Sequence, residues 1–460
     1  MNSRNKDGSI SSLATAALLI AAAQAPLGST LIAVALPSIG EGLQTDLILI
    51  TSFIVTSYLL VNVVCQGPSG KISDLLGHSR ILWTGIILFV LAAFIGFAAP
   101  GVTLLTVSRC AMAVAGAMVT PSTLALLRLH VPPERRGRIF GLFGATMGFA
   151  AAAGPALGGE IVTMFGWRMI FLANLPFLAL AAALLWTNPL PDIATGARWS
   201  CKGLVQAIDF SGIMLLVLPL SLLVCATKVD HIYAMAALGA AIVTGVVFIR
   251  WELKAAEPVL DPRLLLYAAF AAGVGIIALQ NFAMYGLLFA LPQFFSVFRE
   301  SPPEAVGYML FLMMIGMVVA APIGGRLTDR YGPRIAAALG VAPLLAGALL
   351  LCALSSFASP DDALLPLLLF GAGMGLSSAP AQSASMAAIP PNQAGMAAGV
   401  SSTMRYLGGI SSILLFSAIL GDDDSASEER YEILVGLFAG AVALSGLASL
   451  RLPRRQPAAS

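Results

Sequence analysis

Residues 135–176 read RRGRIFGLFGATMGFAAAAGPALGGEIVTMFGWRMIFLANLP, and this stretch decides how the rest of the chain is interpreted. A basic cluster opens it, and an apolar run follows in which small residues recur every few positions. Such a stripe lies on one helix face and lets helix backbones pack closely in a membrane. Pro155 is tolerated there because neighbouring helices satisfy the carbonyl that it frees. The stretch therefore predicts a kinked transmembrane helix with a tight packing seam.

The composition indicates many such helices. Of the 460 residues, 58% are apolar and only 10% are charged, whereas soluble proteins carry roughly 25% charged residues. This excludes the about three soluble domains that the length alone would suggest. The five cysteines and three histidines show no metal-ligand spacing, and no phosphate-loop motif supports ATP-driven transport. We expect an all-α polytopic membrane protein without metal or cofactor, which binds no nucleic acid and is not an enzyme.

A transmembrane helix needs about 20 mostly apolar residues. Fourteen stretches qualify: 13–36, 47–67, 81–99, 102–125, 139–164, 168–188, 209–227, 231–250, 267–292, 304–325, 335–355, 363–387, 395–420 and 431–450. Cytoplasmic loops are enriched in Lys and Arg, which sets the orientation. With the N-terminus inside, nineteen of the twenty-five basic residues are cytoplasmic, four are external and two lie within spans. We therefore expect fourteen transmembrane helices with both termini cytoplasmic.

The chain contains an internal repeat. The segment 70–77 matches 325–332 at an offset of 255, and 131–141 matches 389–399 at an offset of 258. Parallel repeats of this kind build transporters whose binding site lies between the halves, near the membrane midplane. The predicted domains are an N-terminal six-helix half at 1–190, a linker with two inserted helices at 191–266, and a C-terminal six-helix half at 267–460.

Two motifs in the opening stretch resemble those of a known family. Five small residues resemble the antiporter motif of the fifth helix in drug:proton antiporters of the major facilitator superfamily: Gly148, Gly154, Pro155, Gly158 and Gly159. The following residues resemble the W-R-x-x-F-x-x-N-x-P element of the 14-span EmrB/QacA type: Trp167, Arg168, Phe171, Asn174 and Pro176. The resemblance implies a major facilitator fold with 14 helices arranged as 6+2+6, whose two halves rock about a central site.

The repeated loop after the second span resembles the G-x-x-x-D-R-x-G-R-R loop of the superfamily. Its glycines permit sharp turns, and its aspartate can accept hydrogen bonds from the free amides of a helix N-terminus. The resemblance implies a cytoplasmic latch that favours one state of the rocking cycle; the alternative is a plain charged turn. The first copy has Leu75 where the pattern has Arg. The latch residues are Gly70, Asp74, Gly77, Gly325, Asp329, Arg330, Gly332 and Arg334.

Arg109 lies inside the fourth predicted span, in a segment that resembles the family's R-x-x-Q-G motif. A charge inside a membrane needs a partner or water. Glu160 lies at a similar depth in the next span, roughly 8 Å from its outer end, against roughly 10 Å for Arg109. We hypothesise an ion pair between the two that couples transport to protons. The alternative is that Glu160 reaches the outer interface and has only a structural role.

Polar residues near mid-depth in several spans of both halves outline a substrate cavity. They are Gln24, Ser29, Thr30, Asn62, Gln280, Asn281, Ser378, Gln382 and Arg405. Taken singly, each neutral one is better explained by a hydrogen bond between packed helices; taken together, they indicate a mixed polar and apolar cavity. Arg405 resembles the M-R-x-L-G-G element of 14-span exporters, and either faces the cavity or rests against backbone carbonyls.

The first span departs from the family pattern L-D-x-T-I-V-N-V-A-L-P. Gly28 stands in place of the Asp, and Ala33 in place of the Asn. That Asp is the family's usual candidate for engaging protons or cations. Without it, Glu160 is the one acidic residue that we place well inside a span. Two intramembrane arginines against one glutamate favour neutral or anionic substrates.

The resemblance implies a multi-pass protein of a bacterial inner membrane, a secondary active transporter of the multidrug efflux type. It would export small hydrophobic or amphipathic compounds, in exchange for protons. Two alternatives stay open: a narrower exporter of a neutral or anionic metabolite, and a non-transporting sensor on the same scaffold. Its partners would be the lipid bilayer, the small-molecule substrate and protons. The short outer loops leave a periplasmic adaptor undetermined.

Overall fold

The computed structural model of the chain describes residues 10–190, 209–226, 231–256, 258–420 and 427–454. Within these ranges the chain forms helices joined by turns, without a β-strand. The first bundle comprises α1 (Ser12–Leu43), α2 (Leu47–Ile50), α3 (Ser57–Leu76), α4 (His78–Ala98), α5 (Val102–His130), α6 (Arg136–Phe165) and α7 (Leu175–Thr187). The inserted pair comprises α9 (Phe210–Ala226) and α10 (His231–Lys254).

The second bundle comprises α11 (Ala268–Arg299), α12 (Pro303–Tyr331), α13 (Pro333–Leu351), α14 (Leu364–Ala387), α15 (Ala394–Leu420) and α16 (Glu428–Ser449). Short helical turns lie at Thr51–Thr56, Pro133–Arg135, Trp167–Phe171, Pro262–Leu266, Leu354–Ser356, Pro360–Ala363 and Pro391–Gln393. The predicted cytoplasmic location of the two chain ends concerns residues outside the described ranges, as does part of the predicted linker 191–266.

Twelve helices among the described residues are long and apolar enough to cross a membrane, against the fourteen predicted. The two predicted spans that fall short are the second and the seventh. Residues 47–76 are helical throughout, but α3 carries buried polar side chains, among them Asn62, Gln66 and Lys71. α9 has 17 residues, fewer than the about 20 of a full span. The second predicted span thus carries polar side chains that are buried inside the protein, and the described part of the seventh is shorter than a full span.

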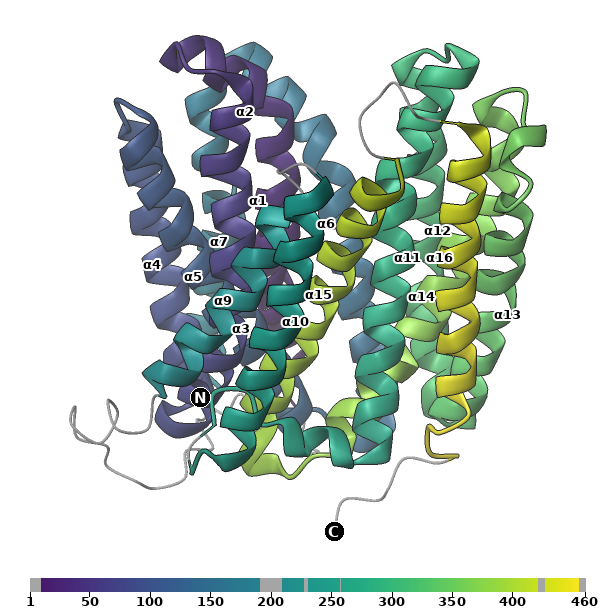
Figure 1. Cartoon of the computed structure of the whole chain (residues 1–460). Coiled ribbons are helices and arrows are strands. Elements are labelled where there is room, and N and C mark those ends of the chain that lie inside the picture. The colour runs from purple at the N-terminus through teal and green to yellow at the C-terminus, as the bar shows by residue number, and fades with distance from the viewer. Residues whose placement is uncertain (1–9, 191–208, 227–230, 257, 421–426, 455–460) are drawn as a thin grey trace.

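The helices form two bundles, with the α9–α10 pair beside them (Figure 1). In the first bundle α1 packs against both α5 and α6, which hardly touch one another, so α1 lies between them. In the second bundle α11 packs against α14, α15 and α16. The inserted helix α9 packs against α3 of the first bundle and α15 of the second. The inserted pair therefore lies over one of the lines along which the two bundles meet.

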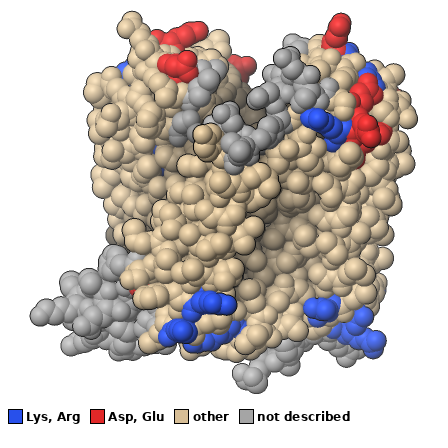
Figure 2. Space-filling view, viewed as in Figure 1, with Lys and Arg blue, Asp and Glu red and all other residues tan. Residues whose placement is uncertain are grey.

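The bundles touch at one end and part at the other (Figure 1). In the view of Figure 2, the end where the bundles touch shows mainly basic side chains, whereas the end where they part shows acidic side chains with some basic ones among them. By the positive-inside rule we expect the end with mainly basic side chains to face the cytoplasm, and we call it the inner end. The molecule is therefore closed at its inner end, and it is hollowed between the bundles at its outer end (Figure 2).

Two glycines of the repeated loop end their helices in the same backbone conformation. Gly77, with φ 104°, follows α3, and Gly332, with φ 86°, follows α12. Positive φ is available to glycine without the steric cost that a side chain imposes. The two positions are 255 residues apart, which is the offset of the repeat. The repeat seen in the sequence therefore extends to the backbone of the two bundles.

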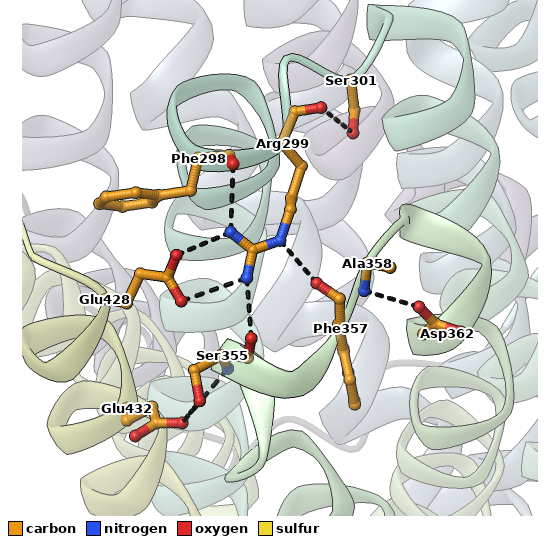
Figure 3. Close-up of polar contacts among 9 residues, drawn as sticks. All are labelled: Phe298, Arg299, Ser301, Ser355, Phe357, Ala358, Asp362, Glu428 and Glu432. Carbon is orange, nitrogen blue, oxygen red and sulfur yellow. Dashed lines mark hydrogen bonds and ion pairs between the residues drawn. The ribbon is translucent and has the colours of Figure 1, made fainter.

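Arg299, the last residue of α11, forms an ion pair and hydrogen bonds that connect three segments at the outer end of the second bundle (Figure 3). Its guanidinium group forms a two-point ion pair with Glu428 of α16, at 2.7 and 3.1 Å. The same group donates to the backbone carbonyls of Phe357 at 2.6 Å and Ser355 at 2.8 Å, between α13 and α14. One planar group thus holds three segments together, which a single point charge does not do.

Replacing Arg299 by lysine keeps the charge but removes the planar fork of donors. We expect Arg299→Lys to lower the melting temperature of the purified protein by a few degrees. Arg250→Lys, at an exposed position of α10, is the control that leaves it unchanged. Thermal unfolding followed by circular dichroism measures the difference, and equal melting temperatures for Arg299→Lys and the wild type would contradict the fastening role.

Candidate functional site

The two bundles are joined at the inner end by a carboxylate from each. Asp74, near the end of α3, accepts hydrogen bonds from the backbone amides of Gly395 and Met396, both at 2.7 Å. These amides belong to the first turn of α15, where backbone N–H groups lack partners within the helix. The positive end of the helix dipole also favours a negative charge at this place. Asp74 thus attaches the first bundle to a helix of the second.

Asp329, near the end of α12, repeats this contact in the opposite direction. It accepts hydrogen bonds from the amides of Gly137 at 2.7 Å and Arg138 at 2.8 Å, in the first turn of α6. The repeat offsets of 255 and 258 relate Asp74 to Asp329 and Gly137 to Gly395. Each bundle therefore gives one carboxylate and receives one, as in an interface with two-fold symmetry. We call the two contacts together the inner gate.

Glycines bring the helix backbones close enough for these bonds. A Cβ atom on Gly70 would collide with the backbone carbonyl of Gly395, and one on Gly325 with that of Gly137. Contacts between backbones at this distance require residues without a side chain. The predicted latch glycines Gly70 and Gly325 therefore lie in the contact itself, whereas Gly77 and Gly332 shape the turns behind it.

The basic residues of the predicted latch form none of the hydrogen bonds described for the inner gate. The guanidinium group of Arg330 lies over the ring of Tyr331, 5.2 Å from its centroid. Arg334 donates its backbone amide to the carbonyl of Pro453 at 3.3 Å. Because Asp74 and its counterpart bind backbone amides, the replacement of an expected Arg by Leu75 leaves the first contact as complete as the second.

Arg128 also joins the bundles, although its sequence context predicts only a cytoplasmic position. Its Nε donates to the carbonyl of Met386 at 2.7 Å, and its Nη2 to that of Ile389 at 3.4 Å. Residues 128 and 386 are 258 apart, an offset of the repeat. This contact therefore joins positions that the repeat makes equivalent, so it lies close to the approximate two-fold axis. That coincidence of offsets is the signal that could have identified Arg128.

Toward the outer end, the first bundle contains a buried polar cluster. Gln24 of α1 and Asn62 of α3 meet at Gly116 of α5, where a Cβ atom would lie 3.2 Å from each side-chain amide nitrogen. Asn62 donates to the carbonyl of Ala113 at 3.1 Å, and Gln66 donates to Asn62 at 2.9 Å. Both polar atoms of the Gln24 side chain are buried without a hydrogen-bond partner among the described residues. Two of the predicted cavity residues are thus brought together here.

Arg109 of α5 is only 2% exposed, and its guanidinium group lies over the ring of Tyr58, 4.1 Å from the centroid. Its Nε and Nη2 atoms have no hydrogen-bond partner in the described part of the chain. Glu160 is exposed on α6 and forms no ion pair with Arg109. The hypothesised ion pair is therefore absent from this structure. The reason is that α1 separates α5 from α6, so helices that are consecutive in sequence are not neighbours.

The second bundle contributes Arg405 of α15. Its Nη2 donates to Oε1 of Gln382 on α14 at 3.1 Å, and Gln382 is also hydrogen-bonded to Ser401 at 3.3 Å. This face of α15 packs inward, because a Cβ atom on Gly408 would collide with the backbone of α11. Arg405 is nevertheless only partly buried.

Three tyrosines lie close to the two arginines, and the sequence prediction did not name them. Tyr58 covers Arg109. Tyr285 of α11 packs against α15 near Arg405, because a Cβ atom on Gly409 would lie 2.8 Å from its ring, and Tyr406 follows Arg405 in the chain. The sequence feature that could have pointed to them is a tyrosine well inside an apolar span, because its hydroxyl group needs a polar partner there.

The other predicted cavity residues are hydrogen-bonded within the second bundle or within α1. Four donate to carbonyls one turn back on their own helix: Ser29 to Pro26 (2.9 Å), Thr30 to Pro26 (3.0 Å), Asn281 to Ile277 (2.8 Å) and Ser378 to Gly375 (3.4 Å). Gln280 of α11 donates to the hydroxyl of Ser377 on α14 at 2.8 Å. Of these five residues, Gln280 forms the hydrogen bond between packed helices that the alternative predicts, whereas the other four bond within their own helix.

The small residues of α6 fit this helix between α1 and α12. Gly154 and Gly158 pack against α1, and Gly148 packs against α12 of the other bundle. The helix continues unbroken through Pro155, and Gly159 has open space at the position of a Cβ atom. The stripe is thus a packing seam with two sides, one inside the first bundle and one between the bundles.

The chain belongs to the Major Facilitator Superfamily, whose family profile matches residues 18–413. It is 31% identical to YvkA of Bacillus subtilis, an uncharacterized MFS-type transporter, over 92% of both chains. It is 30% identical to the multidrug resistance protein Stp of Mycobacterium tuberculosis, over 88% of this chain and 75% of Stp. The protein is therefore a membrane-embedded transporter rather than an enzyme.

Solved structures show the same fold. The proton:xylose symporter XylE superposes with a TM-score of 0.67 at 14% identity, over 95% of this chain and 94% of XylE. The human organic anion transporter MFSD10 superposes with a TM-score of 0.64 at 16% identity, over 95% of this chain and 97% of MFSD10. In this fold the faces that the two bundles turn toward one another are the place where a small molecule can bind.

A methyl group on Gly137 would collide with the carbonyl of Gly325 and with the carboxylate of Asp329. We expect Gly137→Ala to open the inner gate and to speed amide exchange in residues 134–141 and 390–399 by about tenfold, which corresponds to about 1.4 kcal/mol. Gly307→Ala on α12 is the matched control, since it meets open space. Hydrogen–deuterium exchange with mass spectrometry measures both variants. Wild-type exchange rates in Gly137→Ala would show that the glycine contact does not hold the gate.

Proposed function

We propose that this transporter exports small hydrophobic or amphipathic compounds from a bacterial cell by alternating access. The observation that carries the proposal is the inner gate. Two equivalent contacts, one through Asp74 and one through Asp329, close one side of a polar central region whose other side is open. Hydrogen bonds of this kind break and re-form without any rearrangement inside either bundle, as rigid-body rocking requires.

The direction of transport is supported by the relatives. Stp, which is 30% identical to this chain, is named a multidrug resistance protein. A 26% identical relative from Mycobacterium tuberculosis is named a multidrug resistance protein B homolog. A transporter that confers resistance to drugs does so most simply by removing them from the cell, which favours export. The bacterial origin of these relatives supports a location in the plasma membrane.

We propose the 14-span arrangement of the EmrB/QacA type, with the domain limits predicted from the sequence. Residues 47–76 are helical over their whole length, and α9 packs against α10, α3 and α15. Residues 47–76 and α9, added to the twelve long apolar helices, which include α10, make fourteen, arranged as six, two and six. An even number of crossings leaves both termini on the same side of the membrane, and the basic residues favour the inner side.

We further propose that export is coupled to proton entry and that Glu160 carries the proton. Glu160 is exposed on α6 in a structure that is open toward the outer side. Glycine occupies position 28, where the pattern of related antiporters has an aspartate. If protons are coupled to export, another carboxylate must therefore bind them. Arg109 lies elsewhere in the bundle, and its contribution would be electrostatic rather than through an ion pair.

A second candidate function is the narrower export of a neutral or anionic metabolite. It is favoured by Arg109 and Arg405, the two cationic side chains near the centre of the molecule. A non-transporting sensor is disfavoured, because a scaffold that does not rock has no use for a reversible gate.

Cells that lack their own exporters provide the test. We expect cells that express this protein to lose a preloaded dye faster than cells without it, for at least one of rhodamine 123 (cationic), Nile red (neutral) and fluorescein (anionic). A protonophore should abolish the difference. Glu160→Gln should slow export at least about tenfold, whereas Glu41→Gln, at an exposed position near the outer end of α1, should not. Fluorescence of the washed cells gives the rates.

The outcomes separate the two parts of the proposal. If protein that is well expressed and inserted exports none of the three dyes, the efflux function is wrong. If export continues unchanged in the presence of the protonophore, or in Glu160→Gln, then proton coupling through Glu160 is wrong and efflux stands.

A further inference from the structure

We propose that the central region binds an organic anion, a molecule with an aromatic body and one or two acidic groups such as carboxylate or sulfonate. This inference rests on the transport function proposed above and specifies its substrate class. It follows from two guanidinium groups without carboxylate partners and from the tyrosines close to them.

The positive charge at the centre is not neutralised by the protein. Among the described residues, no carboxylate forms an ion pair with Arg109 or Arg405. Arg109 is buried with a tyrosine ring beside it, and Arg405 is partly buried with the amide oxygen of Gln382 as a hydrogen-bond partner. A charge in a low-dielectric interior is costly when no opposite charge lies near it. An anion bound near these two groups supplies the negative charge that the protein does not.

The two cations lie at the depth expected for a transported ligand. Arg405 is ten residues beyond Gly395 of the inner gate on the continuous helix α15, or about 15 Å at 1.5 Å per residue. This distance is half of the about 30 Å thickness of the hydrocarbon core. Arg109 is seven residues from the start of α5 at the outer side, or about 10 Å below it. A ligand on Arg405 therefore has a second cation between itself and the outer side.

The bundles contribute the two charges in different ways. Arg405 is partly accessible, and Gln382 holds its guanidinium group through one nitrogen, Nη2, so other donors stay available. Arg109 is buried behind Tyr58, with Nε and Nη2 unpartnered. The first cation can bind an acidic group directly, and the second adds a favourable field from the opposite wall. A ligand between them interacts with both bundles, which links its binding to the rocking motion.

The tyrosines are the reason why we expect the ligand to have an aromatic body. Tyr285 and Tyr406, which are both partly buried, offer ring faces and edges for stacking, and hydroxyl groups that can donate to an acidic oxygen. Ligand sites of this kind are mostly apolar with a few polar groups that fix orientation. The two arginines disfavour a cationic ligand. No carboxylate offsets them, because position 28 is glycine and Glu160 lies exposed on α6, apart from Arg109.

Two dyes with the same ring system and opposite charge test the substrate class directly. Fluorescein carries a carboxylate and a phenolate on a xanthene scaffold, and rhodamine 123 is a cationic ester on the same scaffold. Binding is measured by fluorescence polarisation with the purified full chain in nanodiscs of neutral lipid. We expect saturable binding of fluorescein that is at least tenfold tighter than that of rhodamine 123. Equal binding, or tighter binding of rhodamine 123, would overturn the proposal.

The variants locate the site. Arg405→Gln should weaken fluorescein binding at least tenfold and leave Nile red binding unchanged, whereas Arg405→Lys should retain most of the affinity for fluorescein. Arg250→Gln is the control for a change of charge at an exposed position. Unchanged fluorescein binding in a monodisperse Arg405→Gln variant would remove Arg405 from the site. Because the comparison of the two dyes uses the wild type, it decides the substrate class even if a variant misfolds.

The binding experiment and the export experiment can fail independently of one another. If the purified protein binds fluorescein but cells export no dye, then the substrate class stands and the export function is wrong. If cells export rhodamine 123 and the purified protein does not bind fluorescein, then export stands and the anionic class is wrong.

Discussion

The structure depends on one interaction that occurs twice: an aspartate at the end of a helix in one bundle that caps the first turn of a helix in the other. This contact needs backbone amides that are free and helices that lie almost in contact, so the chain has glycine at the positions that meet. The residues that supply the carboxylate and those that receive it are exchanged by the sequence repeat. The same pair of contacts thereby joins two bundles that have the same folding pattern.

This way of closing the inner end leaves the centre of the molecule free for function. The gate uses charges that bind backbone, and the outer end of the second bundle is held by Arg299 and Glu428 within that bundle. Neither arrangement uses Arg109 or Arg405, whose charges stay unneutralised in the middle. A transporter requires this separation, because contacts that hold the bundles together internally must survive the motion that breaks the gate.

Much of the fold could be predicted from the sequence, because composition, the length of apolar runs and the internal repeat can be seen without knowing which helices are neighbours in space. The repeat also pointed to the aspartates of the repeated loop and to the glycines around them. What the sequence could not supply was the identity of spatial neighbours. The pairing of Arg109 with Glu160 assumed that consecutive helices pack together, and α1 lies between them instead. The sequence predicted that the loop aspartates bind free amides at a helix N-terminus, but not that these amides belong to the other bundle. Residues 47–76 and α9 show that a helix can be part of the bundle without meeting the length and apolarity of a full span.

The central claim is that the paired aspartate contacts hold the inner end closed. The most direct measurement is the distance between spin labels at positions 80 and 335, which the repeat makes equivalent and which are exposed at the inner starts of α4 and α13. Double electron–electron resonance would compare the wild type with the Asp74→Asn/Asp329→Asn variant in nanodiscs. We expect one short distance in the wild type and a longer, broader distribution in the variant. The same short distance in both proteins would contradict the claim.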